Sequence, residues 1–145
     1  MANTSAICSS FKQELLQGKH NFASSGGDTF KIALFDSDAT LGASTTAFST
    51  SEEITNTSGT AYTSGGASLT SVTPVASSTT AICDFSDVSY SSASFTANGA
   101  LIYNSSASNV AVCAIAFGSD KTATNGTFTI QFPTADATNA IIRLA

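Results

Sequence analysis

The alternation of hydrophobic and polar residues is clearest in the C-terminal half of the chain. Residues 127–132 alternate strictly, with Phe or Ile at the even positions and Thr or Gln at the odd positions. This period of two predicts a strand with one buried face. Residues 110–117 are apolar on both faces, which is typical of a strand covered on both sides. Six further runs predict strands over residues 29–35, 69–76, 79–85, 88–96, 100–104 and 140–144.

Turn residues separate these runs. Asn98-Gly99 precedes the run 100–104, and Asn125-Gly126 precedes the run 127–132. Asn-Gly tolerates positive φ at both central positions of a type I′ turn, so both pairs predict tight hairpins. Pro74 has no amide hydrogen and is expected at a sheet edge or a bulge. The pattern predicts a mainly β fold, a two-sheet and jelly-roll-like β-sandwich of about eight strands, with one short N-terminal α-helix.

The helix is predicted over residues 9–18. A serine at position 9 or 10 can cap its start, and Gly18 is placed to end it. Its apolar stripe comprises Phe11, Leu15 and Leu16. A helix of about ten residues is not stable alone in water, so this stripe must pack against something else. Both the chain's own sandwich and a partner subunit are possible packing surfaces.

Residues 43–66 are dominated by Ser, Thr, Gly and Asn, with Phe48, Ile54 and Tyr62 as isolated apolar residues. A connection of this length is usually functional or mobile. Two interpretations stay open: a loop clamped by those three side chains, or an arm that reaches a neighbouring subunit.

Composition narrows the classes of function. The 145 residues predict a single domain, 1–145, long enough to bury a sizeable core. Charged residues make up only 10% of the chain and the net charge is −5, which argues against nucleic-acid binding. No run of 18 apolar residues predicts a transmembrane helix, and no signal peptide is expected at the N-terminus. Ser and Thr are abundant in the chain, so its surface is expected to be rich in hydroxyl groups and weakly charged. Such surfaces occur in proteins packed into assemblies and also in ordinary secreted or phage-encoded β proteins.

The cysteines do not form a metal-binding pattern. Cys8, Cys83 and Cys113 have no CxxC spacing, and the single histidine, His20, is far from all three in sequence, so a zinc site is not expected. Cys83 and Cys113 lie in apolar runs, where a free thiol behaves as a small hydrophobe. Buried free thiols in a reducing cytoplasm are the main interpretation, and a Cys83–Cys113 disulfide is the alternative.

The acidic side chains do not form a recognisable metal or catalytic site. Four carboxylates could be calcium ligands: Asp36, Asp38, Glu52 and Glu53. The glycine and the glutamate that an EF-hand loop requires are missing, so the EF-hand pattern is absent. Asp84 and Asp87 could act as a glycosidase pair, yet both fall in a predicted turn and the chain has no tryptophan to stack on a sugar. No nucleophile-elbow motif accompanies His20, which is expected to be a surface residue. The sequence predicts no enzyme, no cofactor and no metal site.

Six segments of the chain carry a likeness to a known family: residues 10–16 (SFKQELL), 28–34 (DTFKIAL), 39–42 (ATLG), 62–66 (YTSGG), 98–104 (NGALIYN) and 140–145 (AIIRLA). Through them the chain resembles a family of small all-β virion structural proteins of tailed bacteriophages. The resemblance implies a decoration, or cement, protein that binds the major capsid protein on the capsid exterior, often as a trimer, after synthesis in the host bacterial cytoplasm. It implies no catalytic residues.

A role in capsid binding requires apolar residues that the sandwich does not use. Two regions have apolar residues outside the strand alternation, the predicted helix and the loop 43–66. The candidate partner-binding residues are Phe11, Leu15, Leu16, Phe48, Ile54 and Tyr62. One alternative function is a tail, neck or fibre component in head–tail joining or host adsorption. Another is a carbohydrate-binding sandwich on the virion, which requires Tyr62, Tyr90 or Tyr103 to line an exposed groove.

Overall fold

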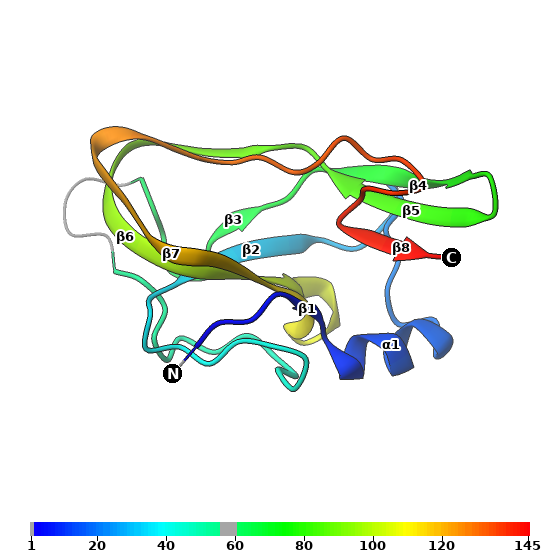
Figure 1. The fold of residues 1–145 in the computed structure, drawn as a ribbon. Helices are drawn as coiled ribbons and strands as arrows, with labels where there is room; N and C mark the ends of the chain where they lie inside the picture. Colours follow the sequence, from blue (N-terminus) through cyan, green and yellow to red (C-terminus); the bar gives the residue numbers. More distant parts are fainter. Residues whose placement is uncertain (1, 56–60) are drawn as a thin grey trace.

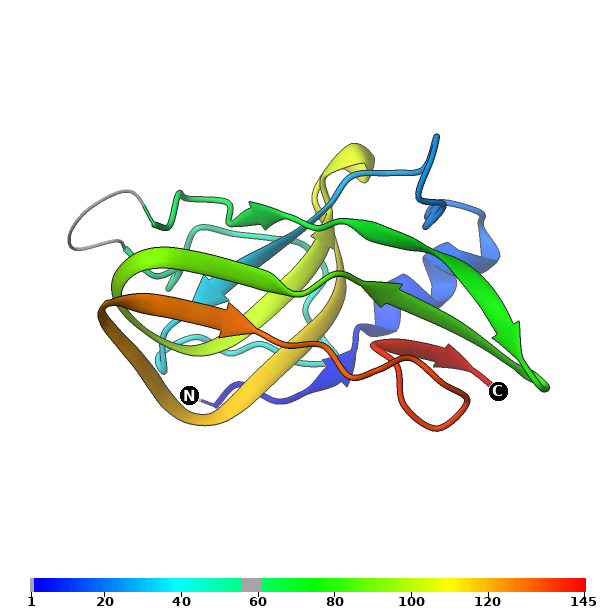
Figure 2. The same ribbon diagram turned by 90° about the horizontal axis from the view of Figure 1, so that it is seen from above.

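The computed structural model describes residues 2–55 and 61–145 and has two antiparallel sheets and one helix. The first sheet has the strand order β1-β7-β6-β2-β3 and the second has the order β4-β5-β8. The strands are β1 (Ala6–Ile7), β2 (Phe30–Phe35), β3 (Ala67–Ser68), β4 (Ser71–Ser77), β5 (Thr80–Phe85), β6 (Val88–Asn104), β7 (Val110–Ile130) and β8 (Ile142–Leu144). The predicted mainly β, sandwich-like fold is confirmed (Figures 1 and 2).

The strands β6 and β7 form one long ribbon that folds over on itself. In Figure 1 its two halves lie one above the other, and the upper half leads toward the second sheet. The register of the ribbon shifts at four places, and shifts of this kind bend a strand and increase its twist. Ser92, Gly118 and Asn125 have positive φ within these two strands. The two ends of this ribbon therefore lie in different parts of the fold, although β6 and β7 belong to the first sheet throughout.

This ribbon contradicts the hairpins predicted at the two Asn-Gly pairs. Asn98-Gly99 lies inside β6 and Asn125-Gly126 lies inside β7, so each pair sits at an irregularity within a strand. At Gly99 an added Cβ would lie 2.9 Å from the carbonyl oxygen of Ile115, so close approach of the two strands favours glycine there. The chain reverses instead after residue 104, through the 3-10 helix η1 (Ser105–Ala107) and two left-handed residues, Ser108 and Asn109.

The helix α1 (Ser9–Leu16) is two residues shorter than predicted. Its N-cap is Cys8, without a side-chain cap, so the prediction of a serine cap was wrong. Its end agrees with the prediction: Gly18 has a φ of 68°, its N–H bonds to the Leu15 carbonyl, and the Lys19 N–H bonds to the Glu14 carbonyl. These two bonds form a Schellman motif, which ends the helix and turns the chain back toward the sheets.

Aromatic side chains form most of the core in two groups. Near α1, Phe22 and Phe30 stack with ring centroids 4.3 Å apart, and Phe11 and Phe85 pack around them. Under the bend of the ribbon the second group comprises Tyr62, Tyr90, Phe95 and Phe128. Both groups belong to one continuous cluster of buried residues that spans the two sheets.

Candidate functional site

The six candidate partner-binding residues fall into three environments. Phe11, Ile54 and Tyr62 are buried in the core, at 0%, 7% and 5% exposure. Leu15 and Phe48 are half-buried and pack against the core. Leu16 alone is fully presented to solvent, at 92% exposure. In this chain the apolar stripe of α1 thus packs mainly on its own sheets, and Leu16 remains available for a partner.

The described part of the 43–66 segment is a clamped loop. The ring of Phe48 stacks on Tyr103 with centroids 4.6 Å apart, and the Ile54 N–H bonds to the Leu34 carbonyl. Tyr62 accepts a hydrogen bond from the Leu34 N–H and donates one of 2.7 Å to Glu53. Burial and the hydrogen bond to Glu53 raise the pKa of Tyr62, so its hydroxyl stays protonated. These contacts favour the clamped loop over the extended arm for residues 43–55 and 61–66.

The tyrosines do not line an exposed groove. Tyr62 and Tyr90 are each 5% exposed and Tyr103 is 2% exposed. A sugar-binding platform needs an accessible aromatic face, so these three residues do not provide the platform that the carbohydrate hypothesis requires.

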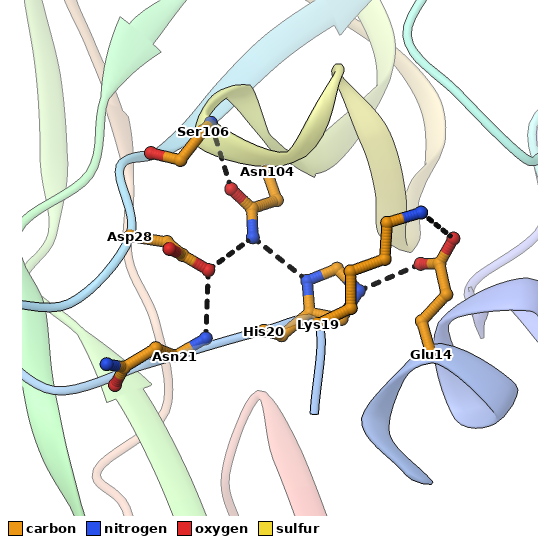
Figure 3. Close-up of polar contacts among 7 residues, drawn as sticks. All are labelled: Glu14, Lys19, His20, Asn21, Asp28, Asn104 and Ser106. Carbon is orange, nitrogen blue, oxygen red and sulfur yellow. Dashed lines mark hydrogen bonds and ion pairs between the residues drawn. The ribbon is translucent and has the colours of Figure 1, made fainter. Parts of the chain in front are cut away.

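A buried polar network lies between α1 and the end of β6 (Figure 3). The His20 side chain is fully buried, so its expected surface position was wrong. Its Nε2 lies 2.8 Å from Glu14 Oε2, and its Nδ1 lies 3.0 Å from Asn104 Nδ2. Asn104 is itself 0% exposed; its amide also donates to Asp28 Oδ2 at 2.8 Å, and its Oδ1 accepts from the Ser106 N–H.

The hydrogen-bond partners of Asn104 indicate which ring nitrogen of His20 donates a hydrogen bond and which accepts one. The amide oxygen is used by Ser106 and one amide hydrogen by Asp28, so the remaining hydrogen points to His20 Nδ1. Nδ1 is then the acceptor, and Nε2–H donates to Glu14. Burial alone would raise the pKa of Glu14, but hydrogen bonds from His20 and Lys19, together with the positive charge of Lys19, lower it. Glu14, His20 and Asn104 are thus joined by hydrogen bonds, and the network holds α1 against the end of β6.

Three of the carboxylates considered as calcium ligands come together. Asp36, Asp38 and Glu52 place one oxygen each within 4.8 Å of one another. Glu53 turns away and accepts hydrogen bonds from Tyr62, Ser64 Oγ and the Gly65 N–H. Asp36 Oδ1 accepts a hydrogen bond from the Asp38 N–H, which is the hydrogen bond of an Asx turn. The cluster is on an exposed turn, where grouped acidic residues are common without a metal ion.

All three cysteines are free and buried, so the Cys83–Cys113 disulfide is contradicted. Burial raises the pKa of Cys8 to about 11 and that of Cys83 to about 12, and it raises the pKa of Cys113 as well. The thiolate is the reactive form, so burial and the raised pKa values make these thiols poor nucleophiles near neutral pH.

An apolar cleft that sequence analysis did not find lies between β1, β7 and the segment before β8. Its volume is about 740 Å³. Its apolar walls include Ile7, Ile115, Phe117, Phe128, Phe132 and Ile141. Among the described residues that line it, Lys121 is the one with a charged side chain. We call this hollow the β1–β7 cleft. It forms because the folded ribbon places Ile115 and Phe117 opposite Phe128, and no local pattern in the sequence encodes that bend.

Comparison with known proteins adds no relative. No protein-family model, curated protein or solved structure matches the chain. No helix among the described residues has the length and apolarity needed to cross a membrane. The structure itself shows a two-sheet β protein with an apolar cleft on its surface.

Proposed function

We propose that the chain is a non-enzymatic structural protein of a bacteriophage virion, a decoration protein that binds the major capsid protein on the outside of the head. The resemblance in sequence supports the virion class. The observation that carries the binding role is the position of Leu16, a large apolar side chain that is 92% exposed at the end of a well-anchored helix. Contiguous apolar patches mark interaction sites, and a partner that covers Leu16 would also cover the half-buried Leu15 beside it.

A decoration protein stabilises the head by mass action, because it binds the assembled shell and not the free subunits. Few charged residues limit mutual repulsion between neighbouring copies on such a crowded surface. If the protein is oligomeric, several weak contacts per particle site add up to tight attachment.

Copy number in purified virions tests the class. Stained gels calibrated against the major capsid protein are expected to give a ratio near one copy per capsid subunit. A few dozen copies or fewer per particle would contradict decoration and favour the alternative, a tail, neck or fibre component. Absence of the chain from virions would overturn both.

Substitution of Leu16 tests the contact. Binding of the Leu16→Gln variant to capsids lacking the protein is expected to be weaker by about tenfold or more, equivalent to about 1.4 kcal/mol. Gln13→Ala, an exposed change on the same helix, is the matched control and should bind like wild type. Unchanged binding of a folded Leu16→Gln variant would move the contact away from α1.

A further inference from the structure

Among residues 2–55 and 61–145, two apolar surfaces are left uncovered, and they lie on different parts of the fold. The first is the β1–β7 cleft. The second is the face of the second sheet that carries Val72 and Val75, which are 45% and 57% exposed. We call this second surface the valine face.

Strand pairing places both valines on one face of the sheet. Val72 is opposite Asp84 and Val75 is opposite Ile82, and directly opposite residues in an antiparallel pair point to the same side. Cys83 and Phe85 alternate with these β5 residues and belong to the buried core, so they point to the other side. The valine face is therefore the outer face of the second sheet, where Asp84 is its acidic neighbour.

The chain cannot place its own valine face in its own cleft. Residues 140 and 141 line the cleft and lead directly into β8. The strand order β4-β5-β8 puts β4 at the opposite edge of the sheet from β8. Figures 1 and 2 show the β4–β5 hairpin extending at one end of the molecule, away from the bend of the ribbon. Each surface is therefore open to a partner.

Edge pairing does not explain the exposure of β4. Proline at position 74 cannot donate a backbone hydrogen bond, and the register shifts between Val72 and Val75. Thr73 Oγ1 accepts a hydrogen bond from the Ser24 N–H at 3.0 Å. These features discourage addition of another strand at the edge, so a partner is expected to contact the face.

Charge indicates which partner fits. Among the described residues, Lys121 in the cleft forms no ion pair and bonds only to Ser119 Oγ. Asp84 beside Val72 also lacks an ion pair there, and its Oδ1 accepts only the adjacent Phe85 N–H. An apolar face with an adjacent carboxylate complements an apolar cleft with one lysine. The same chain supplies both surfaces.

We propose that the β1–β7 cleft of one copy binds the valine face of a second copy, with Asp84 of that copy approaching Lys121. Such a contact joins two different surfaces and is therefore heterologous: it gives a ring if the rotation between copies closes. The inference deepens the oligomeric part of the proposed function by naming its interface. It can be tested without capsids, so its failure would leave the capsid-binding proposal standing.

The first experiment measures molar mass by light scattering and sedimentation over a range of concentrations. Wild type is expected to be oligomeric. Val75→Asp is expected to raise the dissociation constant by at least tenfold, because a carboxylate would enter an apolar cleft. Leu144→Asp is the matched control, since Leu144 is also 57% exposed but does not lie on the valine face. A wild type that stays monomeric at its highest soluble concentration, or a Val75→Asp variant with unchanged association, would overturn the proposal.

Charge reversal tests the pairing itself. Lys121→Glu and Asp84→Lys should each weaken association, and the double variant should recover much of the loss. Lys12→Glu makes the same charge change on the exposed side of α1 and should have no effect. Additive losses in the double variant would show that these two residues do not meet.

A capture experiment distinguishes head-to-tail from symmetric contact. Immobilised Val75→Asp protein keeps an intact cleft, so it should capture wild type but not further Val75→Asp protein. Failure to capture wild type would mean that valine faces pair with each other, which would overturn a cleft-to-face contact. Circular dichroism of each variant verifies that it is folded.

Discussion

At the scale of single residues, Asn104 is the amide on which the buried polar network depends. It bonds to His20, Asp28 and the Ser106 N–H from a position with no solvent exposure. Asn104→Ala would leave these groups unsatisfied, so we expect the free energy of unfolding to fall by about 2–4 kcal/mol. Urea denaturation followed by circular dichroism measures this. Gln13→Ala is the exposed control and should change stability by less than about 0.5 kcal/mol. An equally small change for Asn104→Ala would contradict the network's structural role.

Glu14 makes a pH-dependent contribution to the same network. Its pKa in the folded chain is lowered from the ordinary value of 4.5, against the effect of burial, by hydrogen bonds from His20 and Lys19. A lowered folded-state pKa stabilises the fold above the unfolded value, and this stabilisation is lost as the pH falls through the folded value. Wild type should therefore exceed Glu14→Gln in stability near neutral pH, with the difference shrinking below pH 4.5.

Denaturation of both proteins at a series of pH values measures that difference. Asp38→Asn removes an exposed carboxylate outside the network and is the control for general charge effects. A wild-type advantage that is independent of pH would contradict the assignment to Glu14 ionisation.

At the scale of elements, the sequence predicts each strand better than it predicts how the strands connect. The apolar run 110–117 and the first four residues of the alternating run, 127–130, both lie in β7, although they were expected to be separate strands. Asn-Gly is compatible with a type I′ turn and also with a bulge, and local sequence cannot choose between them. In the structure both Asn-Gly pairs form bulges, because β6 and β7 stay paired on either side of them. That pairing joins residues far apart in the sequence, so local patterns do not reveal it.

The same limit applies to the candidate partner-binding residues. Phe11 has the spacing of a helix stripe, but the sequence does not show that Phe22 and Phe30 would cover it. Leu16 belongs to the same stripe, and only the structure distinguishes it from Phe11 by its exposure. The β1–β7 cleft was not identifiable, since its walls come from residues about 5–7, 113–133 and 140–141, brought together only by the bend.

Two glycines provide a test of this bend and of loop packing. Gly118 and Gly66 have similar φ values, 78° and 75°. A Cβ at Gly118 would meet no atom within 4 Å, whereas one at Gly66 would overlap the Ile32 carbonyl. Gly118→Ala should therefore cost only the left-handed strain, about 1–2 kcal/mol. Gly66→Ala should cost distinctly more, on the order of 3 kcal/mol or above, because a backbone atom must move. Thermal or urea unfolding of the two variants measures how far each substitution lowers the free energy of unfolding. Equal losses would contradict the close approach of Gly66 to the Ile32 carbonyl.

At the scale of the whole molecule, the core links all major elements into one unit. The three cysteines lie in different parts of this core. Cys8 precedes α1, Cys83 lies in β5 of the second sheet and Cys113 lies in β7 of the first sheet. They are 0%, 7% and 3% exposed. Because one continuous cluster joins these sites, we expect them to become accessible together when the chain unfolds.

Thiol labelling with a maleimide at neutral pH measures this directly. The folded chain should react very slowly, because the thiols are buried and burial raises the pKa of each. In denaturant without reductant, all three thiols should react; a single reactive thiol would instead mean that two are bridged. Ser119→Cys, at an exposed position, is the control for reagent quality and should label quickly in the folded state. Mass spectrometry should then give one common labelling rate for the three native cysteines, because each becomes accessible only when the whole chain unfolds. A faster rate at Cys8 alone would show that β1 and α1 open separately from the two sheets, and the fold would then consist of two cooperative units.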